Sequence, residues 1–302
     1  MATDVATEAP LRVRRARPER HWSTLLLIAP SIALLVGFVV VPFVYVVRVS
    51  LATQGPFGSI GTGWTLANYR QFFQTTYLQI LGHSVWLSFE NTVICLVVGY
   101  IVGYFLAFRA GRATPVFVLL LIVPFWASFL VRMSAWMILL SPHGIVASIL
   151  HTLHVASSSV QLVPSNGAVL VGLLYVFLPS AVLPIYAGLR TVDPALVEAA
   201  KDLGCGSLGT HWRVILPLGR PGIVAAALFV FAPSLGVFVI PVLLGGGKSL
   251  IIGNLIVTLY LEFRNMPFGA AVSVVLFVIV MLGIVACLRA MRSADGSEGG
   301  LF

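Results

Sequence analysis

The stretch LLGGGKS, residues 243–249, has the residue types that cradle a nucleotide phosphate. In loops of the pattern G-x-x-x-x-G-K-[ST], backbone N–H groups and a lysine hold the phosphates. Here the first glycine of that pattern is replaced by Val242, and a long apolar run precedes the stretch instead of a short strand. We therefore expect a glycine turn at the end of a membrane helix, with Lys248 at the lipid headgroups. This chain itself is expected to bind no nucleotide.

Other residues that could react or bind a metal do not form recognisable catalytic or metal sites. His151 and His154 are three residues apart and His143 lies in the same loop, but no Glu or Cys ligand stands beside them. The three cysteines are scattered and lack C-x-x-C spacing. The chain has neither H-E-x-x-H nor G-x-S-x-G. We expect no metal site, no cofactor bound by this chain and no enzymatic activity.

Composition defines the surroundings in which these residues must be placed. Of 302 residues, 59% are hydrophobic and 9% are charged, whereas soluble domains carry roughly 25% charged residues. The net charge of +8 is distributed in short basic clusters between apolar runs. That distribution is typical of membrane topology and argues against a nucleic-acid partner. The sequence predicts an all-α integral membrane protein in contact with lipid.

Six apolar segments are long enough to cross a bilayer, which requires about 20 residues per helix. They are 24–47, 84–108, 116–140, 168–189, 222–244 and 267–288. The first follows the basic stretch RVRRARPER, but its apolar core is too long for a signal peptide and no A-x-A-like site follows, so we expect a retained anchor. Short helices at the outer interface are expected in 145–155 and 250–261.

These spans divide the chain into a basic tail, 1–23, a six-span domain, 24–292, and a C-terminal tail, 293–302. Most of the 18 lysines and arginines fall on one side if the N-terminus is inside. The positive-inside rule then places both termini in the cytoplasm.

The largest polar island, residues 190–220, falls on the cytoplasmic side in this topology. Asp193 is a candidate N-cap, Pro194 suits the first helical position, and Gly204 suits the left-handed residue that ends a helix. A second short helix is expected at 207–213, after which ILP returns the chain to the membrane. Residues 194–213 would form a helical hairpin.

Two small residues on this hairpin leave room for close approach by a partner. Ala199 and Ala200 stand beside the carboxylate of Glu198, so a partner backbone could approach closely. This pattern is consistent with a docking peg for another protein. It is also consistent with an ordinary solvated loop, because cytoplasmic loops are normally charged.

The segment EAAKDLG, nine further residues and then the stretch VILP resemble the EAA signature of permease subunits in bacterial ABC importers that use a binding protein. Val214 stands where the signature usually has Ile. Four other stretches resemble the spermidine/putrescine branch of these permeases, namely PFWASFLVRMSAWMILL, YVFLPSAVLPIYAGLRTVDPALVEAAKDLG, LLGGGKSLIIGNLI and NMPFGAAVSV. The resemblance covers most of the chain beyond the first span.

This resemblance implies a MetI-like type I ABC importer permease fold in the bacterial inner membrane. It implies a second permease subunit, homologous or identical, and a periplasmic binding protein that delivers the solute. Two cytoplasmic ATPase subunits would use ATP and Mg²⁺ and dock on the hairpin. The residues implied in coupling are Asp193, Glu198, Ala199, Ala200, Asp202, Gly204, Leu216 and Pro217.

Two ionisable residues lie inside predicted spans, and such residues are functional candidates by default. Glu90 and Arg132 fall at similar depth, roughly 10–12 Å below the outer surface at ~1.5 Å rise per residue. A structural ion pair between them, snorkelling to the interface, and contact with solute or a gate all remain open.

The fifth predicted span is interrupted by FAPSLGVFVIP. Pro233 and Gly236 predict a kink near mid-membrane, where broken helices line many transport sites, although a kink with only a packing role is equally compatible. The polyamine branch usually has an Asp after this glycine, and this chain has Val237. The candidate residues for the path or gate are Glu90, Trp126, Arg132, Trp136, Phe231, Pro233, Ser234, Gly236 and Phe238.

The solute is less defined than the transport machinery. A polyamine would favour carboxylates and aromatic faces, whereas an unpaired Arg132 would repel a cation, so another small polar or anionic solute stays open. A self-contained secondary transporter is disfavoured, because the spans contain no second carboxylate for a proton or sodium relay.

Overall fold

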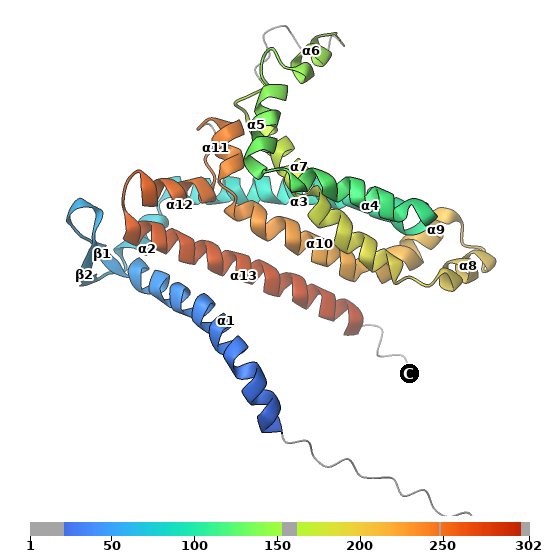
Figure 1. The fold of residues 1–302 in the computed structure, drawn as a ribbon, viewed down its shortest axis with the longest axis horizontal. Helices are drawn as coiled ribbons and strands as arrows, with labels where there is room; N and C mark the ends of the chain where they lie inside the picture. The colour runs from blue at the N-terminus through green and yellow to red at the C-terminus, as the bar shows by residue number, and fades with distance from the viewer. Residues whose placement is uncertain (1–20, 153–161, 248, 297–302) are drawn as a thin grey trace, which may run out of the picture. The chain divides into compact units, whose positions relative to one another are not determined.

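The computed structural model describes residues 21–152, 162–247 and 249–296, and these are almost entirely helical (Figure 1). Most of both predicted tails, His154 and Lys248 lie outside these residues. The chain divides into two units, residues 1–45 and 46–302. The first span is α1, His21–Ser50, with two prolines inside the helix. Apolar side chains between Ile28 and Tyr45 are exposed, as a helix facing lipid requires.

The second unit contains the remaining elements. In chain order they are β1 Ala52–Gln54, η1 Pro56–Gly58, β2 Ile60–Trp64, α2 Ala67–Phe72, α3 Thr75–Phe108, η2 Gly111–Ala113, α4 Thr114–Ile122, η3 Val123–Trp126, α5 Phe129–Leu139, α6 Ile145–Thr152, α7 Asn166–Arg190, α8 Pro194–Asp202, α9 Ser207–Thr210, η4 His211–Ile215, α10 Leu216–Gly236, α11 Val239–Gly245, α12 Ile252–Leu261 and α13 Met266–Gly296. The strands β1 and β2 pair antiparallel. This small hairpin was not predicted, because its Gly- and Thr-rich strands carry little apolar alternation.

The six predicted spans are all present as helical segments. Five helices are long and apolar enough to cross a membrane, and a pair formed by Gly111–Trp126 and Phe129–Leu139 supplies a sixth. That pair is bent by 92°, so the prediction of one continuous helix over 116–140 was wrong. Pro124 lacks a backbone donor, and Ala127 and Ser128 leave helical geometry with ψ of 148° and 136°.

Two other boundaries also differ from prediction. The fourth long helix runs from Ser207 to Gly236, so the predicted span 222–244 starts too late and ends too late. The expected interface helix at 145–155 is present as α6. In contrast, α12 is buried, and its Ile252, Leu255 and Leu259 pack with Phe72 and Phe268. The short helices expected in 145–155 and 250–261 are therefore both present, while their position at the outer interface stays a prediction.

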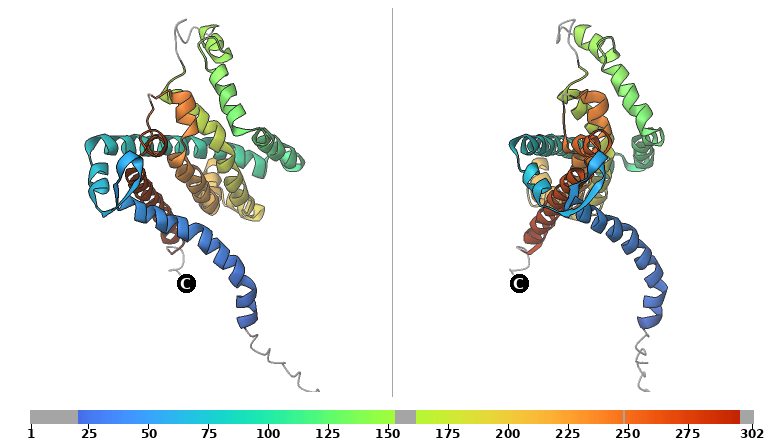
Figure 2. Two further views of the ribbon diagram at one scale, coloured as in Figure 1. Left: turned by 60° about the vertical axis from the view of Figure 1, so that its left-hand side comes forward. Right: turned by 90° about the vertical axis from the view of Figure 1, so that its left-hand side faces the viewer.

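Three helices, α3, α7 and α10, lie side by side at the centre of the second unit (Figures 1 and 2). A methyl group at Gly99 of α3 would lie 3.1 Å from Cβ of Ala181, and one at Gly103 would lie 3.0 Å from Cγ2 of Ile185. Between helices in lipid there is no hydrophobic driving force, so small residues that permit close van der Waals contact hold the pair together.

The crossing of α7 and α10 is tighter still. A methyl group at Gly222 would lie 2.6 Å from the carbonyl oxygen of Pro184 and 3.0 Å from Cα of Gly188. Both neighbours are backbone atoms, so they cannot move away as a flexible side chain could. The two helices can adopt this crossing only with glycine at position 222.

We predict that Gly222→Ala lowers the stability of the detergent-solubilised chain by about 1–3 kcal/mol, the usual range for overpacking. The measurement is thermal unfolding followed by circular dichroism. Gly82→Ala is the matched control, because a methyl group there meets no atom within 4 Å and alanine favours the helix. An unchanged melting temperature for Gly222→Ala would contradict the close crossing.

Candidate functional site

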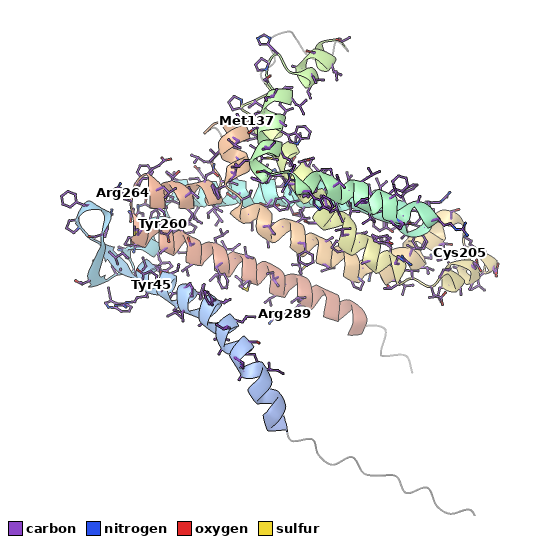
Figure 3. All side chains as sticks on the ribbon, viewed as in Figure 1. Tyr45, Met137, Cys205, Tyr260, Arg264 and Arg289 are labelled. Carbon is purple, nitrogen blue, oxygen red and sulfur yellow. The ribbon has the colours of Figure 1, made fainter. Side chains whose placement is uncertain are left out.

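The polar loop forms the predicted helical hairpin. The carboxylate of Asp193 accepts a hydrogen bond from Ala195 N at 2.9 Å, and Pro194 opens α8. Gly204 has φ of +84° directly after the end of α8. The predicted N-cap and left-handed glycine are therefore confirmed. Figure 3 shows Cys205, the next residue, at the end of the unit opposite Arg264.

The second arm of the hairpin differs from the prediction. The helix α9 continues through a π-helical turn, His211–Ile215, directly into α10. The chain therefore passes through ILP as a continuous helix instead of a turn, and Leu216 and Pro217 lie in the first turn of α10. Pro217 offers no N–H to the carbonyl four residues earlier, and a π turn is a common way for a helix to absorb such a defect.

A polar contact fixes the base of this arm to the transmembrane core. Tyr100 Oη on α3 and His211 Nε2 form a hydrogen bond of 3.0 Å. The ring of Tyr104 also meets the His211 ring edge-on, with centroids 5.2 Å apart. These contacts attach the hairpin base to α3. Local sequence patterns carry no signal for this contact, because the two residues are 111 positions apart.

The exposed surface of α8 is only partly the predicted one. Glu198, Ala199 and Asp202 are exposed, but Ala200 is buried, with 9% of its surface exposed. The small side chain exposed on α8 is therefore Ala199, and docking at Ala200 stays a prediction. On a nine-residue helix, the pair of alanines could not reveal which one faces inward.

Large apolar side chains on the hairpin were missed by the sequence reading. Leu203, Leu208 and Trp212 are 87%, 73% and 62% exposed. All three line a shallow hollow of about 400 Å³ around Gly204. An exposed apolar patch on a charged loop marks an interaction site. The apolar residues within the otherwise polar segment DLGCGSLGTHW were the signal that could have identified it.

The glycine run at 245–247 ends a helix. Gly246 is the left-handed C-cap of α11 with φ of +52°, and Gly247 has φ of +79°. The predicted glycine turn is therefore confirmed, and Lys248 lies outside the described residues. The next described helix, α12, begins at Ile252.

The predicted kink at Pro233 and Gly236 is a complete break. The helix α10 ends at Gly236, Val237 is extended with ψ of 136°, and α11 begins at Val239. Gly253 of α12 closes against this break, because a methyl group there would lie 2.5 Å from the carbonyl oxygen of Val237. Gly253 is a further candidate that the sequence reading did not single out.

The residues predicted for the path differ from one another in burial and in contacts. Ser234 is 1% exposed and its Oγ accepts a hydrogen bond of 2.9 Å from Asn91 Nδ2, which joins α10 to α3. This bond ties Ser234 into the contact between the two helices, and its role in the path stays a prediction. Phe231 is half-buried and would lie 3.8 Å from a methyl group at Gly283 of α13.

Four other predicted path residues lie on the accessible surface of the second unit. Trp126 and Phe238 are 79% and 42% exposed. Pro233 and Gly236 at the break are also exposed. In contrast, Trp136 is half-buried, with its ring centroid 5.5 Å from that of Tyr175.

Arg132 lies on α5, the helix that follows the 92° bend, and is surrounded by aromatic rings. Its guanidinium carbon is 4.5 Å from the ring centroid of Phe125, 5.9 Å from that of Tyr175 and 6.0 Å from that of Phe129. Its Nε and Nη1 are buried without a hydrogen-bond partner. The aromatic faces attract the cation, while the two N–H groups still lack an acceptor.

The structure contains no ion pair between Glu90 and Arg132 within the described residues. The predicted pair assumed that both residues lie on straight spans, where an equal number of residues gives equal depth. The 92° bend before α5 removes that equality. Depth along a helix also leaves undefined the direction in which a side chain points. Glu90 is half-buried on α3.

The exposed aromatic residues and Arg132 could bind a solute through two kinds of interaction. Exposed aromatic faces attract an ammonium group. The unpartnered N–H groups of Arg132 suit a carboxylate or phosphate oxygen. The hairpin offers a protein-docking surface that is separate from this region along the chain.

Comparison with known proteins identifies the family. Residues 99–294 match the family described as "Binding-protein-dependent transport system inner membrane component". The chain belongs to this family, and it is a multi-pass permease of the inner membrane, not an enzyme.

Two curated relatives match over most of the chain. The spermidine/putrescine transport system permease protein PotB of Escherichia coli (strain K12) is 36% identical over 266 residues, which cover 88% of this chain and 97% of the relative. The inner membrane ABC transporter permease protein YdcU of the same strain is 30% identical over 230 residues, covering 72% and 73%.

A solved structure shares the fold. A chain of a bacterial ABC transporter involved in the import of the acidic polysaccharide alginate superposes with a TM-score of 0.74 at 16% identity. The match covers 91% of this chain and 96% of that chain. A second structure shows that transporter in complex with an alginate-bound periplasmic protein.

We predict that Gly253→Ala displaces the broken segment around Val237, because the added methyl group overlaps a backbone carbonyl. The expected cost is about 1–3 kcal/mol of stability. Thermal unfolding of the purified chain measures it. Gly236→Ala is the control for stability, since a methyl group there meets nothing within 4 Å. Equal melting temperatures for the two variants would refute the contact at the break.

Proposed function

We propose that this chain is one transmembrane subunit of an ATP-driven importer, with both termini in the cytoplasm. It pairs with a second permease subunit, homologous or identical, and receives its solute from a periplasmic binding protein. Two cytoplasmic ATPase subunits bind ATP and Mg²⁺ and drive the cycle. This chain binds no nucleotide of its own.

The observation that carries the proposal is the exposed hairpin at 193–213. It combines a capped helix, a left-handed Gly204 and the apolar side chains of Leu203, Leu208 and Trp212. Glu198 adds a carboxylate for a basic residue of the ATPase. Because α7 leads into this hairpin and α10 leads out of it, a displacement of the hairpin moves two of the three central helices.

We propose a polyamine as the solute. The support is the 36% identity with PotB over nearly the whole relative, together with the exposed aromatic face of Trp126. A specific observation favours a second candidate, a small anionic organic solute. Arg132 has two buried nitrogens without acceptors, and a bound anion would supply them.

The coupling proposal predicts that Ala199→Trp and Gly204→Ala both weaken ATPase binding while the chain stays in the membrane. The bulky indole blocks close approach at an exposed position. Gly204→Ala meets no neighbour within 4 Å, so its effect comes from backbone strain of about 1–2 kcal/mol, or roughly tenfold in affinity. Co-purification of the ATPase and solute-stimulated ATP hydrolysis in proteoliposomes measure the effect.

The control for this experiment is Ala67→Trp, an exposed alanine on α2, away from the hairpin in sequence and in Figure 1. It should leave ATPase binding unchanged. Full ATPase binding and normal transport by both hairpin variants would show that this loop is not the coupling element. It would also remove the main support for a cytoplasmic hairpin.

The polyamine proposal predicts that Arg132→Gln lowers the KM for spermidine by about fivefold, because removing a like charge relieves repulsion of about 1 kcal/mol. Uptake of labelled spermidine by proteoliposomes that contain the complete importer measures it. Arg132→Lys keeps the charge and should retain the original KM.

For an anionic solute, Arg132→Gln should change the KM in the opposite direction. Loss of a charge-assisted hydrogen bond, worth about 1.5–3 kcal/mol, raises the KM roughly 10- to 100-fold. A wild-type importer that leaves spermidine outside, but moves an anionic solute in an Arg132-dependent manner, would overturn the polyamine proposal.

A further inference from the structure

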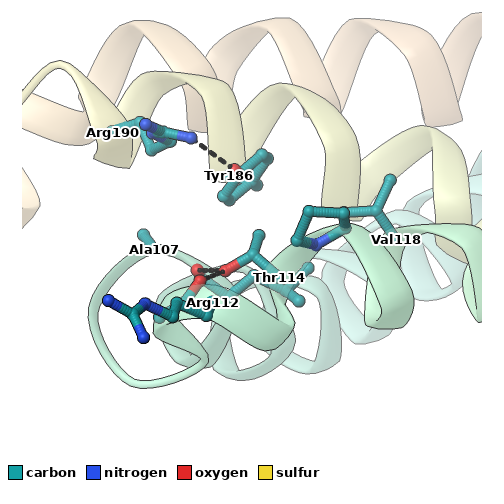
Figure 4. Close-up of a pocket in the computed structure, with 9 residues that line it drawn as sticks. Ala107, Arg112, Thr114, Val118, Tyr186 and Arg190 are labelled. Atoms are coloured by element: carbon teal, nitrogen blue, oxygen red, sulfur yellow. Dashed lines mark hydrogen bonds between the residues drawn. The ribbon is translucent and has the colours of Figure 1, made fainter.

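A pocket of about 530 Å³ lies between the turn that follows α3 and the last turns of α7 (Figure 4). It is lined by Leu106, Ala107, Gly111, Arg112, Thr114, Pro115, Val118, Tyr186 and Arg190. It lies near the hairpin along the chain, because Arg190 is the last residue of α7 and Asp193 caps α8. Neither the coupling surface nor the path described above uses these residues.

The pocket has two chemically different ends. Figure 4 shows the guanidinium groups of Arg112 and Arg190 at one end and Val118 at the other. Neither Asp nor Glu is among the residues that line it. The charged end therefore presents two cations with no carboxylate of the pocket to neutralise them.

Hydrogen bonds hold the charged end in place. Arg190 Nη1 donates to Tyr186 Oη at 3.0 Å, which directs the side chain back along α7. Thr114 Oγ1 lies 2.8 Å from the carbonyl oxygen of Gly111 and 3.2 Å from that of Leu106, so it ties the turn to the end of α3. Arg112 is part of this turn.

The other end continues into a surface suited to hydrocarbon. Pro115 and Val118 belong to α4, whose Val116, Leu119 and Leu120 are 58%, 53% and 62% exposed. In a transmembrane segment, exposed side chains of this kind face lipid. A ligand that fits both ends has an anionic head and an apolar tail.

We propose that this pocket binds the phosphate headgroup of an anionic phospholipid, with an acyl chain along α4. The assignment rests on the orientation proposed above, which places this end of the chain in the cytoplasmic leaflet. Guanidinium groups bind phosphate oxygens in paired hydrogen bonds. Basic pockets between helices on the cytoplasmic side are suited to anionic headgroups.

The position of the pocket gives the lipid a consequence for coupling. A headgroup held by both arginines joins the α3–α4 turn to the end of α7, three residues before Asp193. It therefore anchors the α7 side of the hairpin, while the Tyr100–His211 hydrogen bond anchors the α10 side.

The test is native mass spectrometry of the purified full-length chain titrated with phosphatidylglycerol or with zwitterionic phosphatidylcholine. We expect phosphatidylglycerol to bind more tightly than phosphatidylcholine. Arg112→Gln and Arg190→Gln should each weaken phosphatidylglycerol binding roughly fivefold, and the double substitution should remove the preference. Arg190→Lys should restore part of it. Arg220→Gln is the matched control, an exposed arginine that does not line the pocket.

Three outcomes would overturn the proposal. They are equal affinity for the two lipids, unchanged phosphatidylglycerol binding by the double variant, and displacement of the lipid by millimolar inorganic phosphate, which would identify a free-phosphate site. A solubility and melting-temperature check on each variant separates loss of binding from loss of fold. Lipid titration involves no solute or ATPase, so an incorrect solute or coupling assignment leaves its result unaffected.

Discussion

Close contact between backbones at the centre of the second unit is the constraint on which the rest of this structure depends. In lipid, apolar side chains gain nothing by leaving their surroundings, so helices associate through tight packing and a few polar bonds. Gly99 and Gly103 let α3 approach α7, and Gly222 lets α10 approach α7. The Asn91–Ser234 hydrogen bond joins α3 to α10 in the same core. The hairpin lies between two of these helices in sequence, so their packing determines where its two ends start.

Breaks in the transmembrane helices are the second feature that distinguishes this chain from a simple bundle. A broken helix leaves backbone groups that lipid cannot satisfy, and such segments persist only where protein covers them or a polar cavity receives them. At Gly236–Phe238 that cover is α12, with Gly253 against the carbonyl of Val237 and Ile252 N donating to Ser84 Oγ at 2.8 Å. At the other break, after Pro124, the bend carries Arg132 into an aromatic setting. Each break therefore lies next to a residue that the sequence predicts for the path, Trp126 at one and Phe238 at the other.

The hairpin combines a rigid base with an exposed tip. Its base is attached through His211 to Tyr100 and through the helical continuity of α9 with α10. Its tip exposes Leu203 beside a left-handed glycine. The coupling proposed above requires such contacts at the base, because a loop without them would absorb a displacement of the tip. The sequence signature EAA thus marks a surface whose usefulness depends on contacts made by residues outside the signature.

The sequence by itself determined the features that depend on local chemistry and on the bilayer. Apolar runs of sufficient length fixed six membrane segments, and Asp193 and Gly204 fixed the ends of α8 through hydrogen bonding and a positive φ. Only the tertiary structure decided which side chains face each other. Ala200 faces inward, Ser234 bonds to Asn91, and Arg132 meets aromatic rings instead of Glu90. The spacing of residues along a helix predicts how deep each one lies in the membrane. It predicts neither the direction of a side chain nor the course of the helix beyond a proline, and these two decide which distant residues come into contact.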